Sequence, residues 1–238
     1  MSEVNLSVLQ NFDGTLHEEP YPYLTISDAL PEDLYRELEA AYPSVEQLAG
    51  QGYPSNVRRQ ISAKQGLRDP RVADIWKQFM SYHTSQQFYD EVIDIFGAWC
   101  PDYEGRQACV RNDGRDMQLD CQPGINTPVT SPSSVKGPHV DNRAELYAGL
   151  LYMRKDDDDS VGGDFNVLKP YEPFHPVHKQ EYDPGLFEVV DTVSYRRNQL
   201  VMCLMSAKSF HSVTPRQVTQ HERRLVNVIA EVPTGEVW

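Results

Sequence analysis

Apolar side chains recur at helical spacing in two stretches of the first hundred residues. The first stretch follows a segment with capping residues and an early proline (27–33), as expected before a helix. Its apolar stripe consists of Leu34, Tyr35, Leu38 and Tyr42. The second stretch runs from about 71 to 99 with an interruption near 81–85, and its apolar residues are Val72, Ile75, Trp76, Phe79, Met80, Phe88, Val92, Ile95 and Phe96. We predict amphipathic helices whose aromatic stripes face a core.

After Pro101 the pattern changes to short β-branched, aromatic or alternating segments separated by Gly, Pro, Asn and Asp. This pattern is typical of an antiparallel β sandwich or barrel. The strand candidates are Ala108–Val110, Met117–Cys121, Leu146–Met153, Asp164–Leu168, Phe187–Val193, Gln199–Met205 and Leu225–Val232. The boundary at 101–105 is too short for an interdomain linker, so residues 1–238 should form one α+β domain. Residues 1–100 would supply mostly helical support, packed on one sheet of a β core formed by 105–238.

Composition and charge narrow the class of partner. The chain has 238 residues, is 39% hydrophobic and carries a formal net charge of -13. Nucleic acids are bound by clustered Lys and Arg that release counterions, so this acidic balance argues against a nucleic-acid partner. The run Asp156–Asp159 is interpreted as a solvated loop on an acidic surface.

The cysteines and apolar runs indicate the compartment. The four cysteines show no CxxC spacing, and the N-terminal residues lack the basic and apolar regions of a signal peptide. An apolar run such as 200–205 is far too short to cross a bilayer. We therefore expect a soluble, cytoplasmic protein with reduced thiols and no membrane partner, either a monomer or a homodimer.

One His-x-Asp pair and a distant histidine form a candidate metal site. In an extended strand, residues two apart point to the same face, so His139 and Asp141 can aim at one point. His211 must come from another strand, and the segment between is long enough to hold several strands of a jelly roll. Two histidines and one carboxylate on one face of a metal leave coordination positions open, as in non-haem Fe(II) oxygenases. Chance alone often supplies a His-x-Asp pair, so the surrounding sequence has to support the hypothesis.

That surrounding sequence resembles the prolyl-hydroxylase-like branch of the 2-oxoglutarate- and Fe(II)-dependent oxygenases over about the last 120 residues. The resemblance rests on six pieces in the family's order. They are Gln122-Pro123-Gly124, similar to a Tyr-Pro-Gly turn; Pro138-His139-Val140-Asp141-Asn142; the strand Leu150-Leu151-Tyr152-Met153-Arg154; the Gly-Gly turn in Ser160-Val161-Gly162-Gly163-Asp164-Phe165; Phe210-His211-Ser212-Val213-Thr214-Pro215; and a basic residue opening the final strand.

The resemblance implies a fold, a ligand set and a reaction. The fold would be a double-stranded β-helix (jelly-roll, cupin-like), with His139, Asp141 and His211 holding Fe(II). 2-Oxoglutarate and O2 would be cosubstrates, ascorbate a candidate reductant, and succinate and CO2 the co-products. Family members that bind a halide have a small residue in place of the aspartate, so Asp141 favours hydroxylation over halogenation.

The residues that bind 2-oxoglutarate are less sharply defined. The resemblance implies an arginine on the last strand that pairs with the distal carboxylate, through two parallel charge-assisted hydrogen bonds. Both Arg223 and Arg224 are candidates, and strand alternation allows only one to face the cofactor. We favour Arg223, because Asn227 then shares its face. Tyr152 is implied to reach the same carboxylate, with a core tyrosine as the alternative, and Gln122 is either a ligand near the other end of the cosubstrate or an exposed turn residue.

The substrate stays open between classes. A small molecule or amino acid derivative is favoured as the substrate, because no additional recognition domain is evident. Hydroxylation of a protein side chain such as proline is the alternative. The intact triad argues against a catalytically silent cupin-like binding protein.

His175 and His178 have zinc-like spacing but are interpreted as a pair of loop histidines. The proline- and aromatic-rich region 169–197 is predicted to be a partly ordered loop over the site.

Overall fold

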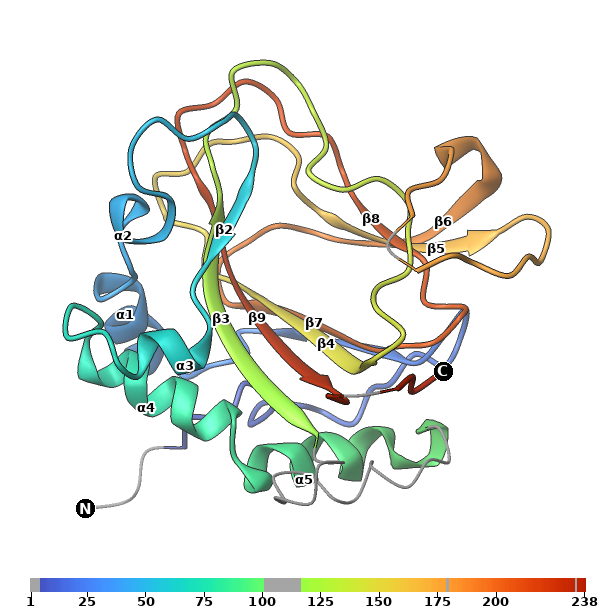
Figure 1. Ribbon diagram of the computed structural model, residues 1–238, viewed down its shortest axis with the longest axis horizontal. Coiled ribbons are helices and arrows are strands. Elements are labelled where there is room, and N and C mark those ends of the chain that lie inside the picture. The colour runs from blue at the N-terminus through green and yellow to red at the C-terminus, as the bar shows by residue number, and fades with distance from the viewer. Residues whose placement is uncertain (1–4, 101–116, 179, 234) are drawn as a thin grey trace.

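The computed structural model describes residues 5–100, 117–178, 180–233 and 235–238 (Figure 1). Its helices are α1 (Glu32–Ala40), α2 (Val45–Ala49), α3 (Ala63–Gly66), α4 (Asp74–His83) and α5 (Gln86–Phe96), with the 3₁₀ turns η1 (Gly97–Trp99) and η2 (Pro184–Leu186). Its strands are β1 (Tyr23–Ser27), β2 (Arg58–Gln60), β3 (Gln118–Asn126), β4 (Glu145–Tyr152), β5 (Phe165–Pro170), β6 (Phe187–Val193), β7 (Gln199–Leu204), β8 (His211–Val213) and β9 (Arg223–Glu231).

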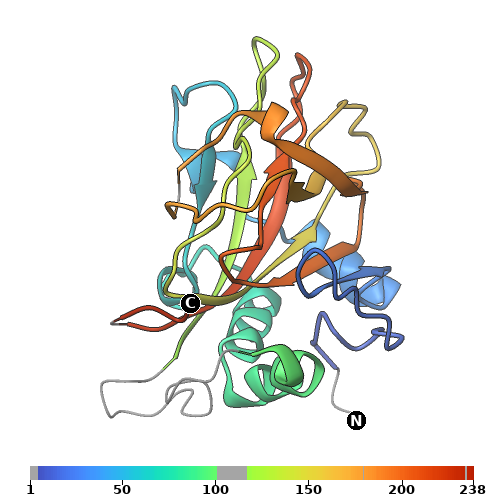
Figure 2. The same cartoon turned by 90° about the vertical axis from the view of Figure 1, so that its right-hand side faces the viewer.

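The strands form two antiparallel sheets. The larger has six strands in the order β1-β7-β4-β9-β3-β2, and the smaller has three in the order β6-β5-β8. The helices cover one face of the large sheet, and the small sheet lies beyond its other face (Figures 1 and 2). The protein thus has a mixed α and β architecture in which the helices pack on one sheet.

Alternation along the strands divides the core into two layers. On β9, Val226, Val228 and Ala230 face the helices and join their aromatic residues in one cluster. Leu225 faces the other way, into a cluster between the two sheets that includes Tyr152. Period-two alternation therefore gives each central strand one face for the helical layer and one for the space between the sheets.

The helical predictions are confirmed, with two strands missed. α1 begins where predicted, and the second helical stretch is interrupted at Thr84 and Ser85, where the Ser85 hydroxyl accepts a hydrogen bond from the Phe88 backbone and caps α5. The prediction that the first hundred residues are mostly helical was wrong for β1 and β2, which pair with β7 and β3 at the two ends of the large sheet. The sequence of β1 carries a strand signal that was overlooked, whereas the three polar residues of β2 carry none.

The strand predictions after residue 116 are confirmed, with β3 longer than expected. The candidate Ala108–Val110 lies outside the described residues. Gln122-Pro123-Gly124 was predicted to be a turn; it lies inside β3 instead, paired with Asn227, Val226 and Leu225. Long-range pairing overrides the local turn preference of a Pro-Gly pair here.

Two further expectations concern helices and thiols. Among the described residues, no helix is long and apolar enough to cross a membrane. Cys100, Cys121 and Cys203 are free thiols, as expected from their spacing.

His83 at the end of α4 makes the helical layer sensitive to acid. It is buried, its Nδ1 lies 2.8 Å from the Phe79 carbonyl oxygen, and its Nε2 accepts a hydrogen bond from the Val8 backbone at 3.2 Å. This arrangement needs the neutral ring, and burial lowers the pKa of His83 to about 4. The unfolded chain binds the proton near the ordinary histidine pKa of about 6.5, so unfolding takes up a proton between these values.

The free energy of unfolding is therefore expected to fall by up to about 3 kcal/mol as the pH drops from about 6.5 to about 4. The contribution is fully present above pH 6.5. Urea unfolding at a series of pH values checks this, with His83→Gln losing much less stability across the window. Equal losses in the wild type and His83→Gln would contradict it. The control His221→Gln removes a histidine whose side chain is 28% exposed and should keep the wild-type dependence.

Candidate active site

The two histidines and the aspartate of the sequence motif meet at one point between the sheets. The Nε2 atom of His139 lies 3.3 Å from Asp141 Oδ1, and Nε2 of His211 lies 3.4 Å from Asp141 Oδ2. One ligand atom from each residue lies within 4.8 Å of the others, the only such group of three found among the described residues. Two ligands about 2.1 Å from one ion at right angles are about 3 Å apart, so this cluster has the dimensions of a facial metal site.

The backbone brings the ligands together in a way that differs from the prediction. His139 and Asp141 were expected on a strand, but Asp141 lies in an irregular segment and His139 forms an isolated antiparallel bridge with His211 at the start of β8. Two backbone hydrogen bonds of 3.0 Å join the two histidines across this bridge. This isolated bridge, and not a regular strand, therefore brings the His139 backbone next to that of His211.

A backbone carbonyl group orients each histidine ring by accepting a hydrogen bond from its Nδ1 atom. Nδ1 of His139 lies 2.8 Å from the Gly137 carbonyl oxygen, and Nδ1 of His211 lies 2.9 Å from that of Ser209. A carbonyl oxygen only accepts, so both Nδ1 atoms carry a proton and both Nε2 atoms point to the shared site, where each donates to Asp141 when protonated and can bind a metal once that proton is lost. Histidines that bind metals are typically held in this way.

The electrostatics of the cluster favour the ionised carboxylate. Burial alone would raise the pKa of Asp141, but the charge of His211 and hydrogen bonds from both histidines hold it well below its ordinary value. For His139, burial and the nearby His211 lower the pKa. For His211, burial acts to lower the pKa, but the charge and hydrogen bond of Asp141 outweigh it and raise the value. The three side chains thus form one mutually dependent ionic group.

Arg223 lies in the same cavity, at the buried end of β9. Its side chain is 1% exposed and lines the space that also contains His139 and Asp141. Nε donates to the Gly163 carbonyl at 2.7 Å, Nη1 to Asn126 Oδ1 at 3.0 Å and Nη2 to the Tyr152 hydroxyl at 3.0 Å. A guanidinium has five donors, so each terminal nitrogen keeps one N–H. These two remaining donors suit a bidentate carboxylate.

The Gly162-Gly163 pair, which was predicted to form a turn, lies in irregular backbone before β5 and makes room for this guanidinium. Both glycines have positive φ angles, 84° and 89°, which favour glycine. A Cβ on Gly163 would lie 2.9 Å from Arg223 Cδ, and one on Gly162 would lie 2.0 Å from the Pro215 carbonyl oxygen. The two glycines therefore allow the close approach of Arg223 on one side and of the Pro215 backbone on the other.

Tyr152 on β4 is fully buried beside Arg223. The Arg223 guanidinium carbon lies 4.8 Å from the centre of its ring as well as donating to its hydroxyl. Burial raises the pKa of Tyr152, so the hydroxyl keeps its proton at neutral pH. This side chain is both a core tyrosine and a neighbour of the arginine, so the two interpretations made from the sequence are compatible.

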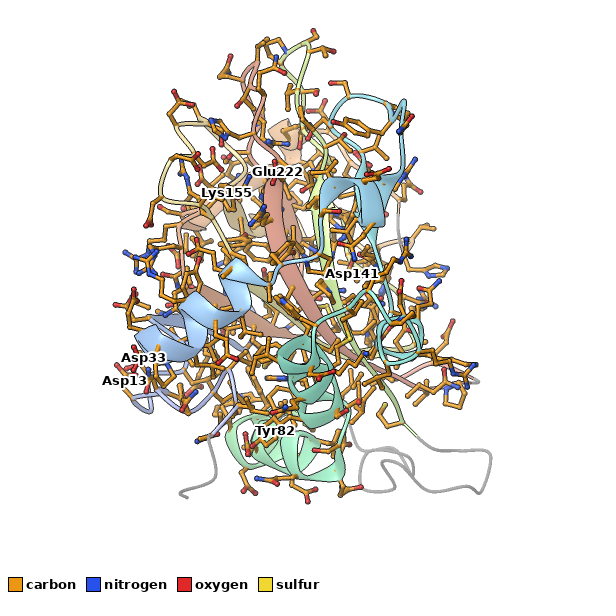
Figure 3. The ribbon with its side chains drawn as sticks, turned by 90° about the vertical axis from the view of Figure 1, so that its left-hand side faces the viewer. Asp13, Asp33, Tyr82, Asp141, Lys155 and Glu222 are labelled. Atoms are coloured by element: carbon orange, nitrogen blue, oxygen red, sulfur yellow. The ribbon has the colours of Figure 1, made fainter. Side chains whose placement is uncertain are left out.

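Arg224 faces the helical side of the sheet. Its Nε pairs with Glu222 at 2.9 Å, and its guanidinium carbon lies 4.9 Å from the centre of the Tyr42 ring. Glu222 also pairs with Lys155 at 2.7 Å, and the two labelled side chains lie next to each other near the start of β9 (Figure 3). Arg224 is thereby separated from the cavity that Arg223 lines.

Gln122 lies on the cavity-side face of β3, one strand away from Asn227. Its Oε1 accepts from Asn227 Nδ2 at 3.1 Å and from Gln60 Nε2 at 2.6 Å, while its Nε2 donates to Asp120 Oδ2 at 2.6 Å. Its amide is committed to these protein groups, and it does not line the cavity itself. The structure thus places Gln122 in a polar network at the edge of the site.

The cavity has a volume of about 290 Å³ and contains polar groups that the sequence did not single out. Arg58, Lys136, Glu145 and Asn227 line it together with apolar residues such as Phe165. Neither Arg58 nor Lys136 lies in a recognisable motif, so the sequence alone could not have identified them. Both reach the site through pairing between distant segments.

The segment before His139 is held by part of the 169–197 region. The Glu181 carboxylate accepts a hydrogen bond from the Gly137 backbone at 2.9 Å, and the Tyr182 backbone donates to the Pro138 carbonyl at 2.8 Å. The region is only partly a loop, because it contains η2 and β6. His175 and His178 lie in irregular backbone between β5 and η2, as the loop interpretation predicted.

Comparisons with known proteins give information on the fold. No family model matches the chain, and no curated protein matches it. Among solved structures, the non-haem, alpha-ketoglutarate-dependent carbocyclase SnoK from nogalamycin biosynthesis is 12% identical, with a TM-score of 0.53, covering 88% of this chain and 79% of that chain. HygX from Streptomyces hygroscopicus, solved with nickel and 2-oxoglutarate, is 12% identical, with a TM-score of 0.50, covering 91% and 85%.

A prolyl-4-hydroxylase from Pseudomonas putida also matches, at 15% identity and a TM-score of 0.49, covering 88% of this chain and 91% of that chain. At these identities, similarity in structure concerns the fold. The chain therefore has the fold of the 2-oxoglutarate-dependent non-haem oxygenases, the superfamily that its ordered motifs resemble.

Proposed function

We propose that this protein is an Fe(II)- and 2-oxoglutarate-dependent dioxygenase that hydroxylates, or otherwise oxidises, an unactivated C–H bond of a small molecule or amino acid derivative. The observation that carries the proposal is that the His139, Asp141 and His211 ligand atoms converge in a cavity that also contains Arg223. The finer fold that we propose is the double-stranded β-helix, with its smaller sheet extended by the His139–His211 bridge.

The donor set fits a divalent iron. Two neutral imidazoles and one carboxylate suit Fe(II), and a facial arrangement leaves positions for other ligands. Asp141 supplies the one negative charge, and Gly137 and Ser209 keep both histidine Nε2 atoms available as ligands. When bound here, Fe(II) with 2-oxoglutarate supplies the oxidation of a C–H bond by O2, with release of succinate and CO2.

The fit for 2-oxoglutarate rests on the donors around Arg223. Its two remaining N–H groups would bind the distal carboxylate, and the Tyr152 hydroxyl lies beside them. The Nδ2 atom of Asn126 is buried without a partner, although Asn126 Oδ1 accepts from Arg223. A buried amide donor without a partner costs free energy, and this one belongs to the residue that contacts the guanidinium proposed to bind the carboxylate.

The protein's own part in the reaction is to bind, orient and exclude water. Arg223 and Tyr152 would hold one end of the cosubstrate, and the metal held by the triad would bind the other. Apolar residues such as Leu150, Phe165 and Val201 line the cavity between the sheets. Fixing the reacting groups in one geometry is where a protein scaffold contributes most to such chemistry.

The test of this function is turnover with candidate substrates. Purified protein with Fe(II), 2-oxoglutarate and air would be supplied with pools of free metabolites or with peptides, and succinate release above the uncoupled background would be measured. The proposal predicts stimulation by a small molecule. Stimulation by peptides or proteins alone would replace it with protein side-chain hydroxylation.

Replacing Gly163 with alanine should weaken the arginine site without touching the metal ligands. The added Cβ would lie 2.9 Å from Arg223 Cδ in a backbone with φ of 89°. We expect a loss of about 1–3 kcal/mol in the free energy of unfolding and weaker 2-oxoglutarate binding. Gly14→Ala is the control, because Gly14 has φ of 91° but no atom within 4 Å of the added Cβ. An equal effect of both substitutions on 2-oxoglutarate binding would exclude a role for the close packing.

A further inference from the structure

A second guanidinium enters the active-site cavity from the edge of the large sheet. Arg58 lies on β2, the outermost strand, and its Cα is paired with that of Asn126, which is itself paired with Arg223 on the other side. Arg58 and Arg223 therefore lie on the same face, two strands apart, and both line the cavity with Asp141. Arg223 is 1% exposed, whereas Arg58 belongs to a strand at the sheet's edge.

The Arg58 side chain is held in position but is not fully paired. Its Nε donates to Gln60 Oε1 at 2.6 Å, and Gln60 is linked through Gln122 to Asp120 by two hydrogen bonds of 2.6 Å. Its Nη2 is buried and has no hydrogen-bond partner. Arg58 forms no ion pair with any residue in the described parts of the chain. Glu145, which lines the same cavity, is among the residues that it does not pair with. An unpaired buried guanidinium donor is costly, so its presence in the wall of a cavity points to a ligand.

The other charges of the cavity do not account for Arg58. The pKa of Arg58 is lowered to about 10, mainly by burial and to a smaller extent by the positive charge of Arg223 nearby. Arg58 therefore remains a cation at neutral pH. Lys136 already pairs with Glu181 at 3.2 Å. If the proposed function is correct, the charges of Fe(II), Asp141, Arg223 and a 2-oxoglutarate dianion cancel. Glu145 is the other acidic residue that lines the cavity, and it forms no ion pair with Arg58, so the Arg58 guanidinium is available to an acidic ligand next to the space where a substrate must bind.

We propose that Arg58 binds a carboxylate group of the molecule that is oxidised, which makes the substrate class a small organic acid. This inference rests on the proposed function. A guanidinium binds a carboxylate through parallel charge-assisted hydrogen bonds, and Nη2 of Arg58 is an available donor. The cavity of about 290 Å³ is at the small end of ligand sites, which suits a small acid beside the cosubstrate. Gln60 and Gln122 are then positioning residues that act through Arg58.

The test is direct binding, independent of turnover. Protein loaded with Zn(II) as a redox-inert metal and with 2-oxoglutarate would be titrated with linear carboxylic acids from propionate to octanoate and with their primary amides, using ligand-observed NMR. Acids should bind and the matched amides should not. Arg58→Gln should weaken binding of the acids at least about tenfold, while leaving the affinity for 2-oxoglutarate within about threefold.

Arg59→Gln is the matched control, because Arg59 is the next residue of β2 and does not line the cavity. It should bind the acids as the wild type does. Arg58→Lys, which keeps the charge and loses the planar fork, should bind them with intermediate affinity, and its thermal unfolding guards against loss of fold. A parallel loss of 2-oxoglutarate affinity in Arg58→Gln would assign Arg58 to the cosubstrate and overturn the proposal.

Binding of amides as well as acids, or of none of the acids at millimolar concentration, would also overturn it. Failure of the wild-type protein to bind 2-oxoglutarate and Zn(II) is a different result, because it contradicts the proposed function itself. The two failures are therefore distinguishable within one experiment.

Discussion

Replacing Asp141 with alanine is expected to abolish 2-oxoglutarate turnover and to weaken Fe(II) binding by more than about 100-fold. Asp141 is the one anionic ligand, and its two oxygens lie 3.3 and 3.4 Å from the Nε2 atoms of His139 and His211. Without it, two neutral imidazoles would have to hold a divalent cation in a largely apolar cavity. Anaerobic titration with Fe(II), or with Mn(II) followed by electron paramagnetic resonance, measures the affinity directly.

The control for this prediction is a histidine outside the cluster. His211→Ala should behave as Asp141→Ala does, whereas His221→Ala should bind metal as the wild type does, because the His221 side chain lies outside the cluster and pairs with the exposed Asp159. Retention of wild-type metal affinity and turnover in Asp141→Ala would reject the proposed ligand set. A loss in His221→Ala as large as in His211→Ala would show that the effect is not specific to the cluster.

Replacing Arg223 with alanine is expected to weaken 2-oxoglutarate binding by about 100-fold or more. The substitution removes two charge-assisted hydrogen bonds to the carboxylate. It would also leave that carboxylate buried beside Tyr152 and Asn126 without a counter-charge. Calorimetric titration of the Zn(II)-loaded protein with 2-oxoglutarate measures the change, and the affinity for the metal should stay close to that of the wild type.

Arg224→Ala is the matched control, since it removes the same side chain from the next residue of β9. Arg224 pairs with Glu222 and packs over Tyr42 on the helical side of the sheet, so its loss should change 2-oxoglutarate affinity less than about threefold. A larger loss in Arg224→Ala than in Arg223→Ala would reverse the assignment. Tyr152→Phe should have a smaller effect than Arg223→Ala, because it removes one neutral hydroxyl.

The parts of the site that the sequence predicted are those with strong local patterns. Alternation in β9 put Arg223 and Asn227 on one face, and the structure places both in the cavity wall. The apolar stripes before residue 100 predicted α4 and α5, because a periodic stripe needs only one core face to pack against. The motif around His139 could be read without knowing that its backbone forms a bridge and not a strand.

The parts that could not be predicted depend on pairing between distant segments. β2 has three polar residues and becomes a strand only because β3 offers it a free edge. Arg58 therefore reaches the cavity by a contact that no local pattern records. Asn126 likewise could not be identified as a site residue from the sequence. Only the structure shows that it accepts a hydrogen bond from Arg223 and that its Nδ2 atom has no partner. Gln122, predicted to lie in a turn, takes part in a strand because sheet pairing outweighs the Pro-Gly signal.

Conversion of 2-oxoglutarate to succinate is the most direct test that the protein is a 2-oxoglutarate-dependent oxygenase. The measurement needs no knowledge of the substrate, because uncoupled turnover in air with Fe(II) already yields succinate, which can be quantified by mass spectrometry. We predict Fe(II)-dependent succinate formation by the wild-type protein, none above background by Asp141→Ala, and formation by Arg223→Ala only at much higher 2-oxoglutarate concentrations. Absence of succinate from wild-type protein that is folded and supplied with Fe(II), or equal formation by Asp141→Ala, would contradict the proposed function.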